Sequence, residues 1–287
     1  MANSTTTSLA SLISPIVQEA LFTASERSIM RGLVREYAVG NNTGKIAQVP
    51  VYPVVSAEDL TEGTDMSGTS ADQTITTTTK NITLKEVGIM TNLTDFIRDT
   101  SEQNVVSHLG RLFGEAIAKK IDTDLIALFA GFSFDAGAAN TDMTPQDIFE
   151  AAAKLRSNNA PGPYYGVFHP NAIFNVKKVL ATQGNTAFGG NGQSELANEA
   201  LRTGFVGSIA GIQIFESSNF TIDGDDDSVG GIFSQEALGL AMQNDLSMEM
   251  QRNASLRAEE VVATARYGVA ELIDTYGVRI QADSVAN

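Results

Sequence analysis

The stretch DTSEQNVVSHLGRLFGEAIAKKIDTDLIALFAG, from Asp99 to Gly131, is the segment around which the rest of the chain is interpreted. Its apolar residues recur at intervals of three and four, the spacing of an amphipathic helix. These residues are Val105, Val106, Leu109, Leu112, Phe113, Ala116, Ile117, Ile121, Leu125, Leu128 and Phe129. At 1.5 Å per residue, such a helix is about 45–50 Å long and crosses a whole domain.

Composition excludes several classes of protein. The chain has 287 residues, 43% of them hydrophobic, no cysteine and a formal net charge of −15. Without cysteine there are no disulfides, thiolate metal sites or thiol catalysis. The acidic balance argues against a nucleic-acid-binding surface, because phosphate contacts need basic patches. We expect no signal peptide and no membrane span.

The segment that precedes the long helix predicts an extended arm. Residues 45–56 and 74–94 have the composition of strands, and residues 57–73 between them are acidic and polar. Pro50 and Pro53 confine the first strand to an edge. Because an isolated two-stranded hairpin is marginal in water, another part of the structure or another copy of the chain must support it.

Residues 1–13 are rich in Ser and Thr and predict a loose N-terminal arm, followed by a short helix that starts at Pro15. The residues after it hold the one basic spot in an acidic chain, formed by Arg27, Arg31 and Arg35.

After the long helix, residues 132–142 read as a linker of small residues. Helices are predicted at 144–157, 171–182 and 194–204, and strands at 161–170 and 206–217. This alternation indicates a compact α/β subdomain. Residues 238–253 and 255–283 then return to extended structure, and these strands are expected to pack on the long helix.

No motif predicts a catalytic, cofactor or metal site. Residues 40–45 are one residue short of a phosphate loop, and residues 189–195 lack the third glycine of a dinucleotide loop. His108 and His169 form no metal-binding pair. Three aspartates begin like a calcium loop that Ser228 and Ser234 then break; they are Asp223, Asp225 and Asp227. Carboxylates in a polar loop tip are expected to be solvated rather than catalytic.

The order of these parts resembles that of tailed-phage major capsid proteins with the Hong Kong 97 fold, which is α+β. Residues 163–170, Pro-Tyr-Tyr-Gly-Val-Phe-His-Pro, are similar to the strand-to-helix entry of their axial domain. Residues 255–259, 266–269 and 277–280 are similar to their C-terminal strands.

The resemblance implies four parts. They are an N-terminal arm (1–29), a peripheral domain (30–45, 93–142 and 236–287) with a spine helix (99–131), an extended loop (46–92) and an axial domain (143–235). The extended loop would lie over a neighbouring subunit. Lys80 and Lys85 invite comparison with the lysine–asparagine crosslink of the family, but the sequence identifies no partner for either.

The implied function is that of a structural protein, not an enzyme. It would assemble with itself into pentamers and hexamers of an icosahedral head that encloses DNA without binding it specifically. A separate scaffolding protein, a portal and a decoration protein are the other implied partners, and assembly would occur in the host cytoplasm.

The sequence also leads to a contact hypothesis and leaves two alternatives open. Arg27, Arg31 and Arg35 are expected to pair with acidic residues in the loop tip of a neighbour. These acidic residues are Glu58, Asp59, Glu62 and Asp65. The first alternative is a fibre or surface-adhesion protein, suggested by the Thr-rich strands, and the second is a small-molecule enzyme with a pocket in the α/β part.

Overall fold

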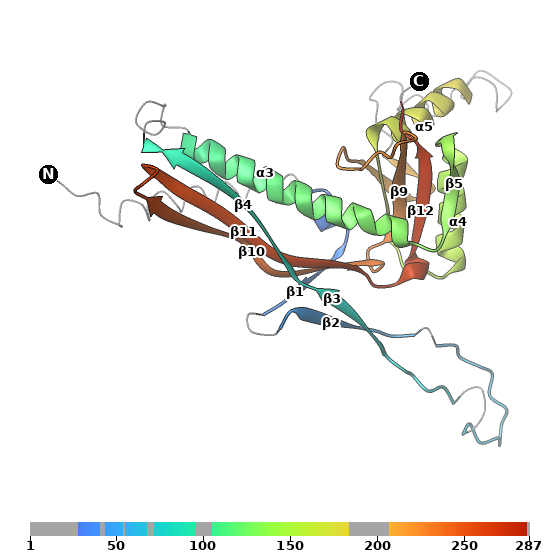
Figure 1. Cartoon of the computed structure of the whole chain (residues 1–287). Helices are drawn as coiled ribbons and strands as arrows, with labels where there is room; N and C mark the ends of the chain where they lie inside the picture. The colour runs from blue at the N-terminus through green and yellow to red at the C-terminus, as the bar shows by residue number, and fades with distance from the viewer. Residues whose placement is uncertain are drawn as a thin grey trace.

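The computed structural model describes residues 28–40, 44–53, 55–67, 72–95, 105–183 and 207–285. It is an α+β structure in which a long helix joins two sheets, and a thin two-stranded arm projects from the first sheet (Figure 1). The N-terminal arm proper, the helix predicted at Pro15, the glycine-rich loop and the helix predicted at 194–204 lie outside the described residues.

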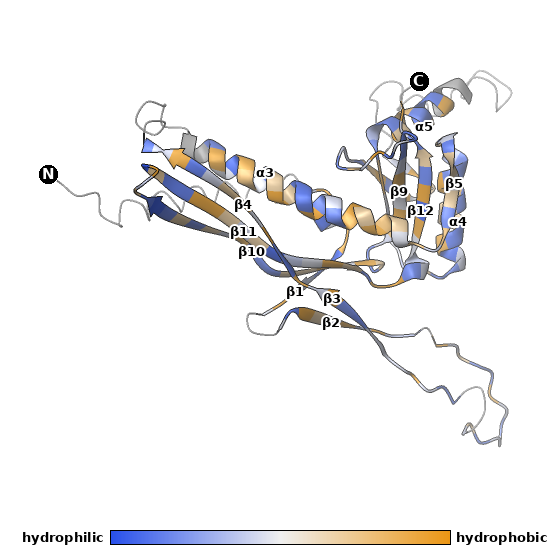
Figure 2. Cartoon of the chain, in the orientation of Figure 1, coloured by the Kyte–Doolittle hydropathy of each residue, from blue (hydrophilic) through white to orange (hydrophobic). Residues whose placement is uncertain are grey.

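The long helix is confirmed as α3, Val105–Ile126, with 22 residues and a length of about 33 Å. A 3-10 helix, η2 (Ala127–Gly131), continues it. The first six residues of the predicted helix fall outside the described residues. Apolar and hydrophilic residues alternate along α3 as an amphipathic helix requires (Figure 2).

The apolar side of α3 packs on a four-stranded sheet. In order, its strands are β1 (Arg35–Ala38), β10 (Leu238–Asn253), β11 (Ala258–Glu271) and β4 (Lys85–Thr94). β10 and β11 are antiparallel and were predicted as strands that return to the long helix, which the structure confirms.

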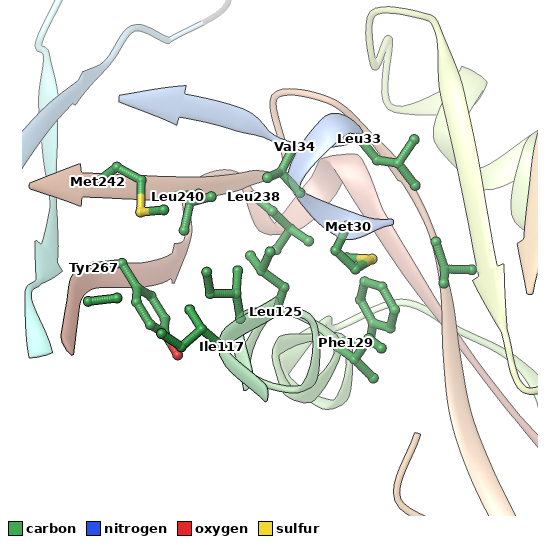
Figure 3. Close-up of a cluster of buried hydrophobic side chains, with 14 of the residues drawn as sticks. Met30, Leu33, Val34, Ile117, Leu125, Phe129, Leu238, Leu240, Met242 and Tyr267 are labelled. Carbon is green, nitrogen blue, oxygen red and sulfur yellow. The ribbon is translucent and has the colours of Figure 1, made fainter. Parts of the chain in front are cut away.

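The core between helix and sheet is closed by the first described turn of the chain. Met30 begins the 3-10 helix η1 (Met30–Gly32) and is fully buried. It lies beside Phe129 of η2, and Leu125 of α3 and Leu238 of β10 belong to the same cluster, which extends to Tyr267 of β11 on its far side (Figure 3). Each fully buried side chain of this size stabilises the fold by about 1.5–3 kcal/mol, so this cluster fixes the helix on the sheet.

The second sheet has six strands. In order they are β5 (Asp135–Asp142), β12 (Gly277–Asp283), β9 (Asp227–Ser234), β6 (Tyr164–Phe168), β8 (Ile212–Glu216) and β7 (Ser208–Ile209). A short 3-10 helix, η3 (Asp274–Tyr276), precedes β12. Gly211, with φ of +82°, separates β7 from β8, so the segment predicted as a strand at 206–217 is divided there.

Two helices pack on this sheet, α4 (Pro145–Ser157) and α5 (Pro170–Gln183). The predicted start of α4 is confirmed as a capping box: the Thr144 side chain accepts from the backbone at Asp147, and the Asp147 carboxylate accepts from the Thr144 backbone N–H at 2.8 Å.

One predicted linker is a strand instead. Residues 132–142 were expected to be a small-residue linker, but β5 pairs parallel to β12. The local sequence, DAGAANTD, does not have the composition of a strand, and only Ala136 of β5 is buried in the structure. Gly137 has φ of +75°, and a Cβ there would lie 2.7 Å from the Gln281 carbonyl oxygen, so close approach to β12 determines this segment.

The long strand predicted at 74–94 is divided at Leu84. The first part, β3 (Thr78–Thr83), pairs with β2 (Ile46–Val51) in the arm, and the second part is β4 in the four-stranded sheet. Likewise β12, which the sequence placed with the peripheral part, belongs to the six-stranded sheet, where Val278 and Ile280 are buried. Both differences are tertiary pairings that local composition does not encode.

Candidate assembly site

The arm is a thin structure with little core of its own. Only six residue pairs join β2 to β3, and Pro50 lies in a strand with an open edge, as predicted. Farther out, the Gln73 side chain bridges the two runs by accepting from the Ser56 N–H at 3.2 Å and donating to the Ser56 carbonyl at 2.7 Å. The arm therefore projects as two extended segments of the same chain that run side by side (Figure 1).

Exposed apolar side chains concentrate on this arm. Half of the large apolar residues that are exposed in the described structure belong to it, although it is a small part of the chain. They are Ile46 (49%), Tyr52 (68%), Val55 (53%), Leu60 (62%), Met66 (49%) and Ile75 (59%). Exposed apolar side chains that gather on one projecting element suit a surface that another molecule could cover.

The predicted acidic residues of the loop tip share this exposure. Glu58, Asp59, Glu62 and Asp65 all lie on the outer part of the arm and are exposed. Asp65 accepts a hydrogen bond from the Ser67 N–H at 3.0 Å. The tip therefore presents carboxylates beside Leu60 and Met66, which suits a partner with both basic and apolar groups.

The root of the arm is fixed, in contrast to its tip. Val49, Ile82 and Leu84 are buried in a small cluster with Ala241 and Leu272. At Gly268 a Cβ would lie 2.5 Å from the Thr83 carbonyl oxygen, so β11 passes directly against the arm. The direction of the arm is thus set by packing at its root.

Two of the three predicted arginines already have partners within the chain. Arg31 binds Asp245 through Nη1 at 2.9 and 3.0 Å, and Glu36 through Nε and Nη2 at 3.2 and 3.0 Å. Arg35 forms a longer ion pair of 3.2 Å with Glu236, and its side chain is 55% exposed. Arg27 lies outside the described residues. Arg35 is therefore the more available of the two for a second carboxylate.

Two aspartates of α3 that the sequence did not single out join distant segments. Asp122 is fully buried, and its carboxylate accepts from Ser28 Oγ at 2.7 Å and from the backbone N–H groups of Ile29 and Met30 at 3.0 and 3.2 Å. Burial raises the pKa of Asp122 above its ordinary value, and these hydrogen bonds offset the rise only in part.

Asp124 lies at the base of the arm. Its carboxylate pairs with Lys85 at 2.5 Å and Lys120 at 3.0 Å, and the Tyr267 hydroxyl donates to it at 2.5 Å. Burial raises the pKa of Asp124, but the hydrogen bonds from these three groups outweigh burial and leave its pKa below the ordinary value. Since Lys85 opens β4, the cluster holds the strand that continues from the arm against α3.

The motifs that resembled catalytic or metal sites have structural roles. His169 Nδ1 accepts from the Asn171 N–H at 3.2 Å, and burial lowers its pKa. His108 is exposed on α3. Asp227 is buried and accepts from the Asn140 N–H at 2.9 Å, while Asp223 accepts from the Asp225 and Asp227 N–H groups. These aspartates therefore close a turn.

Within the described ranges, no group of three or more His, Cys, Asp or Glu residues is arranged to hold a metal ion. The helices described here include none long and apolar enough to cross a membrane. Residues 41–43 of the loop that resembled a phosphate loop, and all of the loop at 189–195, fall among residues the structure leaves undescribed.

Comparison with known families decides what kind of protein carries this arm. A family model described as phage capsid protein matches residues 76–280. The chain belongs to the phage capsid protein family. The match begins in the arm just before β3 and runs through α3 into β12, so it includes the four-stranded sheet except β1 and the six-stranded sheet except the end of β12. No curated protein matches the sequence.

Solved structures agree on the fold. The capsid of cyanophage P-SCSP1u has a TM-score of 0.69 and 20% identity over 90% of this chain and 89% of its own. The head of Helicobacter pylori bacteriophage KHP40 has a TM-score of 0.66 and 10% identity over 90% and 92%. The SrpI encapsulin complex of Synechococcus elongatus has a TM-score of 0.64 and 14% identity over 90% and 88%.

These likenesses establish the Hong Kong 97 fold predicted from the order of parts. Because an encapsulin has it too, the fold alone does not select the function, and the family membership does. The capsid protein is a structural major component of a phage head, located in the virion capsid, where it associates with copies of itself. The fibre alternative finds no support.

Proposed function

We propose that this capsid protein builds an icosahedral head from pentamers and hexamers in which the arm of each subunit lies over a neighbouring subunit. The observation that carries the proposal is the concentration of exposed apolar residues on the arm, Leu60 and Ile75 among them. Modest contacts of this kind, repeated around a closed shell, add up to a stable assembly.

The proposal includes a specific contact between Arg35 of one subunit and the loop tip of a neighbouring subunit's arm. Arg35 would receive a carboxylate from the neighbour's loop tip, with Arg31 and Arg27 contributing to the same basic spot. Arg35 suits this role because its pair with Glu236 is exposed and single. An exposed ion pair contributes about 0–1 kcal/mol and can be exchanged for another at low cost.

Other partners follow from the same proposal. A separate scaffolding protein, a portal and a decoration protein would complete the head in the host cytoplasm. The formal net charge of −15 supports a container that encloses DNA without binding it tightly. No catalytic step is part of this proposal.

The arm is tested by replacing its exposed apolar residues. The variant with Leu60, Met66 and Ile75 all changed to Ser is expected to fold but to form no closed shells in negative-stain micrographs. Its matched control is Phe149→Ser, which removes an apolar side chain that is 54% exposed on α4. Shells from the arm variant at the yield of the parent would contradict the proposal.

The contact at Arg35 is tested by reversing charges in pairs. Arg35→Glu is expected to impair shell formation. If the contact is between subunits, reversing Glu58, Asp59, Glu62 and Asp65 to Lys restores shells. If Glu236→Arg restores them instead, the pair within the chain is the one that matters, and the contact between subunits is refuted.

A further inference from the structure

The buried carboxylate of Asp122 is placed where three segments of the chain meet. It lies on α3, and its hydrogen bonds reach Ser28, Ile29 and Met30, which are 92 to 94 positions away in sequence. A side-chain hydrogen bond from Asn219 ties the connection between β8 and β9 to the same group.

Asp122 acts as a helix cap supplied from outside the helix. The 3-10 helix η1 begins at Met30, and its N-cap residue Ile29 has no side chain that can accept a hydrogen bond. The carboxylate of Asp122 takes this role by accepting from the N–H groups of Ile29 and Met30. The direction of the chain at Ser28 is therefore set by a residue of the long helix.

A carboxylate is a costly choice for this position. Asp122 has 0% exposure, and no basic side chain of the described residues pairs with it. Burying a charge without an opposite charge is unfavourable, and the hydroxyl and N–H donors compensate only in part. An apolar residue would fill the space at less cost but would not fix Ser28, Ile29 and Met30 in one arrangement. The group therefore contributes directional specificity more than stability.

The point that Asp122 fixes is the entry of the N-terminal segment into the core. Ser28 directly follows residues 1–27, and Met30, Leu33 and Val34 insert into the main core immediately afterwards. Ile29 and Asn219 also line a cleft of about 410 Å3 beside α3, with Lys119 and Glu216 at its rim. The point where residues 28–30 meet α3 thus lies next to this surface cleft, between the two sheets.

We infer that Asp122 is a positioning residue that fixes the backbone at Ser28, Ile29 and Met30, where the described chain enters the core, and that shells form only when this arrangement is correct. The second part rests on the proposed function, in which the subunit's extensions contact neighbouring copies. The first part concerns the isolated subunit and can be tested without assembly.

The test compares Asp122→Asn with a matched control from the same helix turn. Ile121→Ala removes a buried side chain that is 2% exposed and lowers stability, but it leaves the hydrogen bonds from Ser28, Ile29 and Met30 to Asp122 in place. Amide hydrogen exchange at Ile29 and Met30 is measured in the full-length subunit, together with the rate of trypsin cleavage after Arg27. Negative-stain micrographs of assembly reactions supply the third measurement.

Asp122→Asn is expected to raise exchange at Ile29 and Met30, and cleavage after Arg27, by about tenfold, because a hydrogen bond to a charged carboxylate is stronger than one to a neutral amide. Its shells should be absent or of mixed diameter. Ile121→Ala should leave exchange and cleavage within about twofold of the parent. Ser28→Ala, which removes one donor, should show a smaller rise and serves if Asp122→Asn does not fold.

Each of the remaining outcomes would refute one part of this inference. Unchanged exchange and cleavage in Asp122→Asn, or in Ser28→Ala when the first variant does not fold, refute the positioning role, as does an equal rise in Ile121→Ala. Raised exchange with normal shells refutes the link to assembly. Failure of the proposed function appears separately, as an absence of shells from the parent protein, and leaves the exchange measurements decisive for Asp122.

Discussion

Replacing Phe129 with Ala tests how strongly the end of the long helix holds the two sheets together. Phe129 is fully buried, and its ring lies 5.4 Å from that of Phe233 on β9 and 6.1 Å from that of Phe132. A Cβ at Gly231 would lie 2.8 Å from the Phe129 ring, so β9 presses its backbone against this side chain. The ring therefore links α3 directly to the second sheet.

The expected loss follows from this packing. Truncation of a buried Phe to Ala costs about 3–5 kcal/mol, and the cost is highest where the neighbours cannot close the cavity. Gly231 has no side chain to move into the space, and β9 is held by strands on both sides. We therefore expect Phe129→Ala to lower the free energy of unfolding by about 4–5 kcal/mol.

Urea unfolding of the unassembled subunit measures this loss, followed by far-ultraviolet circular dichroism because the chain has no Trp. With a slope of about 3 kcal/mol per molar urea, the midpoint should fall by about 1.5 M. Phe149→Ala on α4 is the matched control, since Phe149 is 54% exposed and its loss should cost less than about 0.5 kcal/mol. A loss below about 2 kcal/mol for Phe129→Ala, or one equal to that of the control, would refute the assignment of Phe129 to the joint between the sheets.

Two further measurements test other parts of the structure. Gly277→Ala is expected to lower the free energy of unfolding by about 3 kcal/mol or more, because the new Cβ would lie 2.2 Å from the Phe132 ring. Gly224→Ala is the control, since a Cβ there meets no atom within 4 Å, and it should lower the free energy of unfolding by less than about 1 kcal/mol. Equal urea midpoints for the two variants would contradict this expectation. The lowered pKa of Asp124 means that its contribution to stability is present above the ordinary value of 3.8 and is lost as the pH falls through its lower value in the folded protein. Asp124→Asn should therefore flatten the dependence of the urea midpoint on pH below about 4, and an unchanged dependence would show that the cluster does not act through charge.

The parts of the fold that were predictable are those whose signal is local. The helical period from Val105 to Ile126 and the start of a helix at Thr144 are both encoded within a few residues, and both are confirmed. The order along the chain of the N-terminal arm, the extended hairpin, the long helix, the α/β subdomain and the C-terminal strands was enough to predict the Hong Kong 97 fold. In contrast, β5 is a strand because Gly137 lets it approach β12, and that partner lies more than a hundred residues away.

The candidate site shows the same division. The exposed acidic tip at Glu58 and Asp59 could be predicted because composition alone marks a solvated loop. Asp122 and Asp124 could not, since periodicity alone assigns the polar residues of this helix to its solvent side. Their partners, Ser28 and Lys85, become neighbours only in the folded chain.

The mixture of apolar and acidic side chains on the arm has a consequence for free subunits. Two arms that meet tip to tip bring their carboxylates together, so like-charge repulsion opposes the strand-to-strand association that Leu60 and Ile75 would otherwise promote. A surface of a neighbour that presents arginines instead of carboxylates meets no such repulsion. The same residues therefore oppose non-specific association between the arms of free subunits.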